Sequence, residues 1–233
     1  MGCRAQLGVP PSVGVLFTSD GHPVNQQRNL NRRPLELSLP EEMQLALPGA
    51  EGRIPYGWMD IGAAAMIDLA IAGRLTSTPA WLGQPSDSRL SLADESPTGN
   101  APLDFLIAAL QEHGRPWRAS PCLRRLSRGI SEATSASLAA RGIVRPHGGI
   151  AEKGAYLEVR DAPARSAAEE RMRASPADLR GDALMDIWRR SGITWIPEPG
   201  IFGPRIGGDY PAEARGTIVA VLDALFAVNG SVS

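Results

Sequence analysis

The sequence predicts a mainly α-helical protein: a single globular helical domain built around a buried central helix, with a short β-hairpin at its periphery. Two observations favour this class. Several segments repeat apolar residues at helical spacing and end at a glycine, whereas apolar runs of strand length are few and short. With 233 residues, 43% of them hydrophobic, the chain is long enough for one sizeable core.

Residues 1–34 are expected to form a flexible tail. They are rich in Gly, Pro, Asn, Gln and Arg, most clearly in GHPVNQQRNLNRRP, and show no sustained periodicity. Such a composition buries too little apolar surface to order itself. The helical domain is therefore expected to cover residues 35–230.

The domain is expected to begin with a helix in LSLPEEMQLAL. Ser38 is placed to cap this helix, with Pro40 and an acidic pair in its first turn. Leu39, Met43 and Leu47 recur every fourth residue, which predicts one buried stripe.

The central helix is predicted in WMDIGAAAMIDLAIAGRL. Asp60 and Asp68 leave an uncharged stretch that is too short to cross a bilayer. At helical spacing the segment is apolar nearly all round, which is typical of a buried helix, and Gly73 is placed to close it. We therefore expect a core helix over Asp60–Ala72, with Asp60 at its positive end and not in a catalytic pair.

The remaining elements follow in order. Arg89–Ala93 is a candidate short strand. Apolar spacing then predicts one helix around Leu103–Leu110, which includes Phe105 among its apolar residues and ends at Gly114, and a second helix over Leu123–Leu138 ending at Gly142. GIVRPHGGIAEKGAYLEVRD predicts the hairpin. Further helices are expected over Leu179–Trp188, stopped at Gly192, and in TIVAVLDALFAV.

Composition and motifs exclude several classes of function. The net charge of −1 gives no reason to expect wholesale binding to nucleic acid. Cys3 and Cys122 form no CxxC pair and the histidines are scattered, so we expect no structural metal, no cofactor and a reducing, cytoplasmic setting. RIGGDY lacks the context of a phosphate loop, and Ser96 lacks a nucleophile elbow. We therefore expect a protein that is not an enzyme.

The strongest local charge excess is RPWRASPCLRRLSR, which holds no acidic residue. On a helix, Arg124, Arg125 and Arg128 project within an arc of about 100°. Guanidinium groups bind phosphate oxygens through paired donors, and Trp117 suits a membrane interface. The alternative is a solvated helix face whose arginines pair with Glu132 and Glu112.

Four motifs in this order resemble the Golgi phosphoprotein 3-like family, and in particular its bacterial members, which are common in actinobacteria. They are LSLPEEMQLAL, AAAMIDLAIAGRL, DESPTGNAPLD and SLAARGIV followed by the hairpin segment. The resemblance runs from about Leu37 to Val144 and more weakly to Val228. It implies a mostly helical domain that binds phosphatidylinositol 4-phosphate and sits peripherally on a membrane, here its inner face, without a transmembrane segment.

The family's binding residues carry over in part. Of two family arginines three residues apart, one falls on Arg128 and the other on Ser131, while a third falls on Gly62. The family's tryptophan lies near Trp58. We therefore expect a lipid headgroup site made by Arg128, Arg124, Arg125 and Trp58. The alternative is a soluble protein-interaction adaptor that keeps the scaffold and has lost the lipid site.

Overall fold

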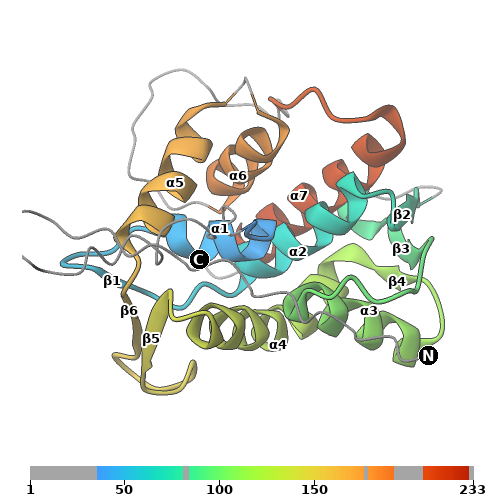
Figure 1. The fold of residues 1–233 in the computed structure, drawn as a ribbon. Coiled ribbons are helices and arrows are strands. Elements are labelled where there is room, and N and C mark those ends of the chain that lie inside the picture. The colour runs from blue at the N-terminus through green and yellow to red at the C-terminus, as the bar shows by residue number, and fades with distance from the viewer. Residues whose placement is uncertain (1–35, 81–83, 176–177, 192–206, 231–233) are drawn as a thin grey trace, which may run out of the picture. The chain divides into compact units, whose positions relative to one another are not determined.

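The computed structural model describes residues 36–80, 84–175, 178–191 and 207–230 (Figure 1). The chain divides into two compact units, Met1–Glu36 and Leu37–Ser233, and the second holds all the elements below. The tail expected over residues 1–34, the stop expected at Gly192 and the start of RIGGDY lie outside the described residues.

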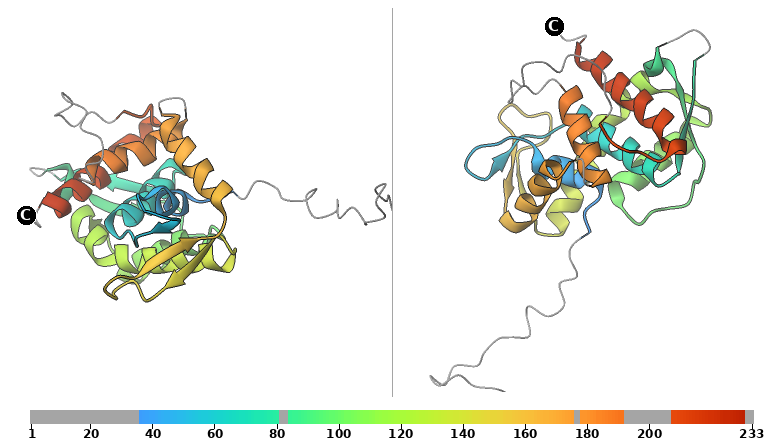
Figure 2. Two further views of the ribbon diagram at one scale, coloured as in Figure 1. Left: turned by 90° about the vertical axis from the view of Figure 1, so that its left-hand side faces the viewer. Right: turned by 90° about the horizontal axis from the view of Figure 1, so that it is seen from above.

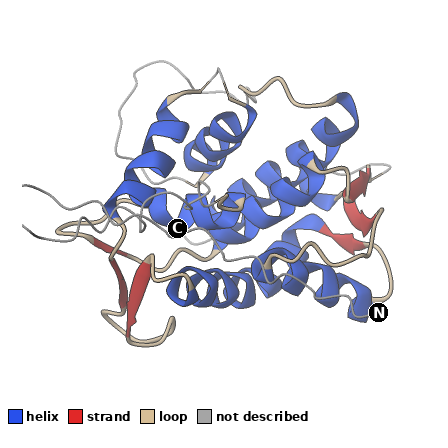
Figure 3. Ribbon diagram, viewed as in Figure 1, coloured by secondary structure: helices blue, strands red, loops and turns tan. Residues whose placement is uncertain are grey.

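The described part of the chain is mainly helical, as the sequence predicts (Figure 3). Its α-helices are α1 (Leu39–Ala46), α2 (Met59–Ile71), α3 (Ala101–His113), α4 (Ala119–Ala140), α5 (Ala162–Arg173), α6 (Leu179–Arg190) and α7 (Ala212–Gly230). A short 3-10 helix, η2, covers Pro85–Asp87. Gly114 and Gly142, which follow α3 and α4, adopt positive φ angles of 68° and 71°, so both glycines end their helices as expected.

The strands form two small antiparallel sheets, where the sequence predicts one hairpin and a candidate strand over Arg89–Ala93. The first sheet has the order β1 (Arg53–Ile54), β6 (Tyr156–Val159) and β5 (Val144–His147). The hairpin expected in GIVRPHGGIAEKGAYLEVRD is its β5–β6 pair. The second has the order β2 (Leu75–Thr78), β3 (Arg89–Leu92) and β4 (Trp117–Arg118). Because β4 immediately precedes α4, this second sheet fixes where α4 begins.

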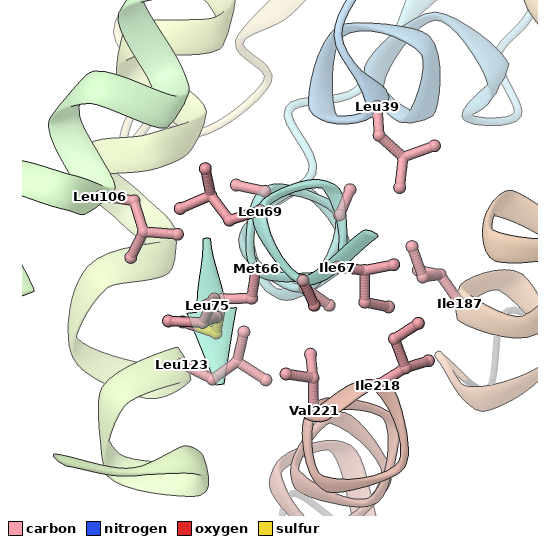
Figure 4. Close-up of a cluster of buried hydrophobic side chains, with 14 of the residues drawn as sticks. Leu39, Met66, Ile67, Leu69, Leu75, Leu106, Leu123, Ile187, Ile218 and Val221 are labelled. Carbon is pink, nitrogen blue, oxygen red and sulfur yellow. The ribbon is translucent and has the colours of Figure 1, made fainter. Parts of the chain in front are cut away.

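Helix α2 lies inside the domain and is contacted from most sides. Figure 4 shows it end-on, with labelled side chains of α1, α3, α4, α6 and α7 directed toward it. Ten of its thirteen residues are buried, from Asp60 to Ala70 with Asp68 excepted. A helix that is apolar nearly all round can be buried in this way because it offers neighbours a contact surface on every side.

Helix α1 is also enclosed, although three of its eight residues, Glu41, Glu42 and Gln44, are polar. Both views in Figure 2 place the blue α1 among helices from later parts of the chain. Its Glu41 carboxylate is fully buried and accepts hydrogen bonds from Arg141 at 3.0 and 3.1 Å and from Ser137 at 2.8 Å. Its Glu42 carboxylate pairs with Arg171 at 3.2 Å and Arg180 at 3.1 Å. The polar side of α1 therefore joins it to α4, α5 and α6.

Helix α5 is not predicted from the sequence. Its segment APARSAAEERMR is polar, and Ala168 is its one buried residue. The local signals are the N-cap, where the Asp161 side chain accepts a hydrogen bond from the Ala164 backbone N–H at 3.0 Å, and the proline that follows. No apolar stripe predicts this helix, and its Arg171 pairs with Glu42 of α1 at 3.2 Å.

Candidate functional site

The arginine-rich stretch RPWRASPCLRRLSR passes through β4 and continues into the first three turns of α4, which lies beside α3 in Figure 1. Leu123, Leu126 and Ile130 are buried, as expected of the inner stripe of an amphipathic helix. Arg124, Arg125 and Arg128 lie on the exposed face between them. The sequence thus places three guanidinium groups on the outside of the longest helix in the described part of the chain.

Two of these arginines line one open hollow at the start of α4. It has a volume of about 460 Å³ and is lined by Ser120, Pro121, Arg124 and Arg125. Two hydrogen bonds attach the first turn of α4 to η2 and the residue after it. The Ala119 N–H donates to the Ser88 carbonyl at 2.9 Å, and the Ser120 hydroxyl donates to the Ser86 carbonyl at 3.3 Å. The hollow therefore sits at the N-terminal turn of a long helix.

The electrostatics of this hollow favour an anion. The first turn of α4 carries no acidic residue, and its backbone N–H groups form the positive end of the helix dipole. Among the described residues, neither Arg124 nor Arg125 has an acidic side chain within 4.0 Å. The two guanidinium groups are therefore left to bind a ligand or water.

Arg125 is supported by an aromatic side chain. Its guanidinium carbon lies 5.9 Å from the centroid of the Trp117 ring. The Trp117 ring in turn stacks on the His113 ring, with centroids 3.9 Å apart and 20° between the planes. A cation over an aromatic face keeps its charge while losing conformational freedom. Trp117 thus belongs to the site, and His113, which the sequence does not single out, belongs to its support.

Arg128 differs from the other two. It donates through Nε to the Glu132 carboxylate at 3.1 Å, four residues further along α4, and both side chains are more than half exposed. Such a surface pair contributes little to stability. The pairing predicted for a solvated face therefore holds for Arg128 with Glu132, and Arg128 does not line the hollow.

Trp58 stands at the N-cap of α2 with 40% of its surface exposed, and it is not among the residues that line the hollow. The Gly57 carbonyl beside it accepts a hydrogen bond from the Ser131 hydroxyl of α4. This contact places the start of α2 against α4 about one turn beyond Arg128. The structure thus brings Arg124 and Arg125 together at the hollow, leaves Arg128 further along α4, and places Trp58 on another element, at the start of α2.

The positions expected to carry two further arginines are buried between α2 and α4. Ser131 is 0% exposed. A Cβ on Gly62 would overlap the Ser127 side chain and lie 3.1 Å from Leu123 Cδ1. Neither position presents a side chain to solvent, so any anion site in this protein must use other residues.

The weaker candidates serve the fold. The Gly207 N–H of RIGGDY donates to the buried Asp186 carboxylate at 3.1 Å, an arrangement that would repel a phosphate. Asp68 accepts from the Leu39 N–H at 2.7 Å and faces Arg180 at 3.6 Å. Asp60 is buried, its Oδ1 has no hydrogen-bond partner, and burial raises its pKa to about 6.

Two searches limit the chemistry of the described residues. Within ranges 36–80, 84–175, 178–191 and 207–230, no three His, Cys, Asp or Glu side chains are grouped to hold a metal ion. In those same ranges, no helix combines the length and the hydropathy needed to span a bilayer.

The fold and this surface define a class: a mainly helical domain whose longest described helix presents arginines over an open hollow. A sequence model of the Golgi phosphoprotein 3 (GPP34) family matches residues 39–193, about two thirds of the chain, and the protein belongs to that family. A search of curated proteins gives no match.

Proposed function

We propose that this protein is a peripheral membrane protein that binds an anionic phospholipid headgroup through Arg124 and Arg125, with Arg128 and Trp58 on the same side of α4. The observation that carries the proposal is the pair of arginines that line one hollow and have no acidic partner among the described residues. Guanidinium groups bind phosphate oxygens through paired N–H donors and stay charged at any physiological pH.

Membership in the family supports phosphatidylinositol 4-phosphate as the headgroup to test first. Its phosphomonoester projects beyond the glycerol phosphate and suits an open hollow. The same chemistry fits an inner, anionic leaflet, the setting we propose for a bacterial member of the family. In this role the protein acts by binding, and we propose no catalytic activity for it.

Vesicle flotation tests the proposal. We expect recovery with phosphatidylcholine vesicles to rise when they contain phosphatidylinositol 4-phosphate, and to rise less with phosphatidylglycerol at matched charge. The double variant Arg124→Gln/Arg125→Gln should lose most of this binding, whereas Arg145→Gln, an exposed arginine on β5, should retain it. Equal recovery with and without the phosphoinositide would refute the headgroup specificity.

The second candidate is a soluble adaptor, and the burial of Gly62 and Ser131 favours it. Those positions serve helix packing here, so a scaffold of this kind needs no lipid. An adaptor predicts that Arg128→Ala and the double variant leave membrane association unchanged. It also predicts a stoichiometric complex with one purified protein partner.

A further inference from the structure

Phe105 is an exposed aromatic residue beside the arginine face. It belongs to α3, and 39% of its surface is exposed although its sequence context is apolar. Its ring lies directly against the backbone of Gly129 in α4, where a Cβ would come within 2.8 Å of Phe105 Cε1. The absence of a side chain at Gly129 therefore lets the ring rest on α4 while its other side stays in solvent.

The order of residues around α4 places this ring at one edge of the arginine face. Each residue turns the helix by about 100°, so from Ser131 the exposed arc passes Arg124 at about 20°, Arg128 at about 60°, Arg125 at about 120° and Gly129 at about 160°. Ser131 bonds to Gly57, next to Trp58, and Gly129 lies under Phe105. The arginines thus project between two contacts of α4, one with Gly57, which precedes the exposed Trp58, and one with the exposed ring of Phe105.

The surface of α3 around Phe105 suits a flat partner. Ala101 and Ala108 precede and follow Phe105 at helical spacing, and both are exposed and uncharged. The charges nearest along this side of the two helices are Glu112, one turn further on α3, and Glu132, which is paired with Arg128. An exposed ring, small neighbours and unpaired arginines on one surface are the chemistry of a lipid interface.

We propose that Phe105 is a membrane anchor, which enters the interfacial layer of an anionic membrane while Arg124 and Arg125 contact headgroups. This inference rests on the proposed function and adds the side chain that supplies apolar contact. Electrostatic attraction alone is weakened by salt, whereas burial of an aromatic ring is not. Phe105 thus makes binding persist at salt concentrations that screen the arginines.

The test compares four proteins in flotation with phosphatidylcholine vesicles that contain phosphatidylinositol 4-phosphate or phosphatidylglycerol at equal charge. Phe105→Ser should weaken binding by about fivefold to tenfold, the loss expected for one partly buried ring, and the deficit should persist at high salt. Phe105→Trp, which keeps an aromatic ring at this position, should bind the vesicles as tightly as the wild type does. Phe226→Ser, which removes an exposed ring on α7, should bind as the wild type does.

A depth measurement separates anchoring from a structural role. The tryptophan of Phe105→Trp should add fluorescence that brominated lipids quench, because the ring lies among acyl chains near the headgroups. The membrane anchor would be overturned if Phe105→Ser bound vesicles as tightly as the wild type, or if Phe105→Trp showed no added quenching. Neither result would contradict the arginine site. Failure of the wild type to float with either vesicle would overturn both.

A protein contact at Phe105 gives a different result. If two copies of the chain associate through this ring, sedimentation should show a dimer that Phe105→Ser converts to a monomer, without a change in flotation. That outcome would also overturn the membrane anchor.

Discussion

Gly62 of α2 and Ser127 of α4 meet so closely that any side chain on the glycine would overlap the serine. Leu123 lies on the same side, so the neighbouring helix offers no space into which a substituent can move. The place where the family resemblance expects a cationic contact is therefore a tightly packed contact between α2 and α4.

Substitution of Gly62 should destabilise the protein. Gly62→Ala gains helix propensity of about 1 kcal/mol, but overpacking at a helix crossing costs about 1–3 kcal/mol, so the net change should be a loss. Gly62→Arg should be far more damaging. Urea unfolding measures both, and Gly62→Ala/Ser127→Ala should recover part of the loss because it removes the nearest atom. A stable Gly62→Arg protein that binds lipid more tightly would contradict this packing.

Loss of the Glu41 charge should be costly. Its carboxylate is fully buried and is held by Arg141 and Ser137, so Glu41→Gln leaves a partly exposed guanidinium with a weakened partner. The free energy of unfolding should fall by about 2–3 kcal/mol, the loss typical of charge-assisted hydrogen bonds. Glu132→Gln removes the exposed partner of Arg128 and should change it by less than about 0.5 kcal/mol. Similar losses of stability in Glu41→Gln and Glu132→Gln would contradict the difference between a buried and an exposed carboxylate.

Asp60 should make stability depend on pH. Burial raises its pKa from the ordinary value of 3.8 to about 6, so the folded protein favours the protonated acid. The stability that this provides is present below pH 3.8 and is lost as the pH rises through 6. Asp60→Asn should therefore stabilise the protein by up to about 3 kcal/mol at pH 7 and by little at pH 4.

The difference between Asp60→Asn and wild type, measured by denaturant unfolding across this range, isolates Asp60 from Glu42 and Asp68, whose pKa values burial also raises. Asp94 provides the contrast, because hydrogen bonds from Ser96 lower its pKa, and Asp94→Asn should not stabilise the protein at pH 7. If the difference in unfolding free energy between Asp60→Asn and the wild type did not change with pH, burial would not raise the pKa of Asp60.

Glu132 should compete with lipid for Arg128. The pair at 3.1 Å occupies the Arg128 guanidinium, which in its absence would face the same surface as Arg124. Glu132→Gln should therefore strengthen binding to anionic vesicles by about twofold to fivefold at low salt, with less effect at high salt. Fluorescence titration of the vesicles measures the change. Weaker binding in Glu132→Gln would indicate that the carboxylate orients Arg128 toward the ligand.

The helices that could be predicted from the sequence are those that bury an apolar stripe. The continuous apolar character of α2 and the spacing of Leu123, Leu126 and Ile130 in α4 are local signals. Helix α5 lacks such a signal because it buries a single residue, and its Arg171 forms ion pairs with Glu42 and Asp178. Strands as short as β1 and β4 depend on partners far away in the sequence, which no local pattern reveals.

Of the candidate site, the sequence predicts only that its arginines share one side of a helix. Spacing along one helix places Arg124, Arg125 and Arg128 on a single side, but not the hollow, which depends on the contacts of β4 and η2 with the start of α4. Phe105 was expected among apolar residues of a helix. Its place against α4 depends on the absence of a side chain at Gly129, a tertiary contact that periodicity does not encode.

Helix α7 has a consequence for comparisons within the family. The family match ends at residue 193, yet Ile218, Val221 and Leu225 of α7 are fully buried in the core around α2. A fragment that ended at the match would leave one side of α2 exposed to water and prone to aggregation. Substitutions in α2 and α7 should therefore accumulate jointly during evolution, and chimeras between relatives should exchange the two helices as a pair.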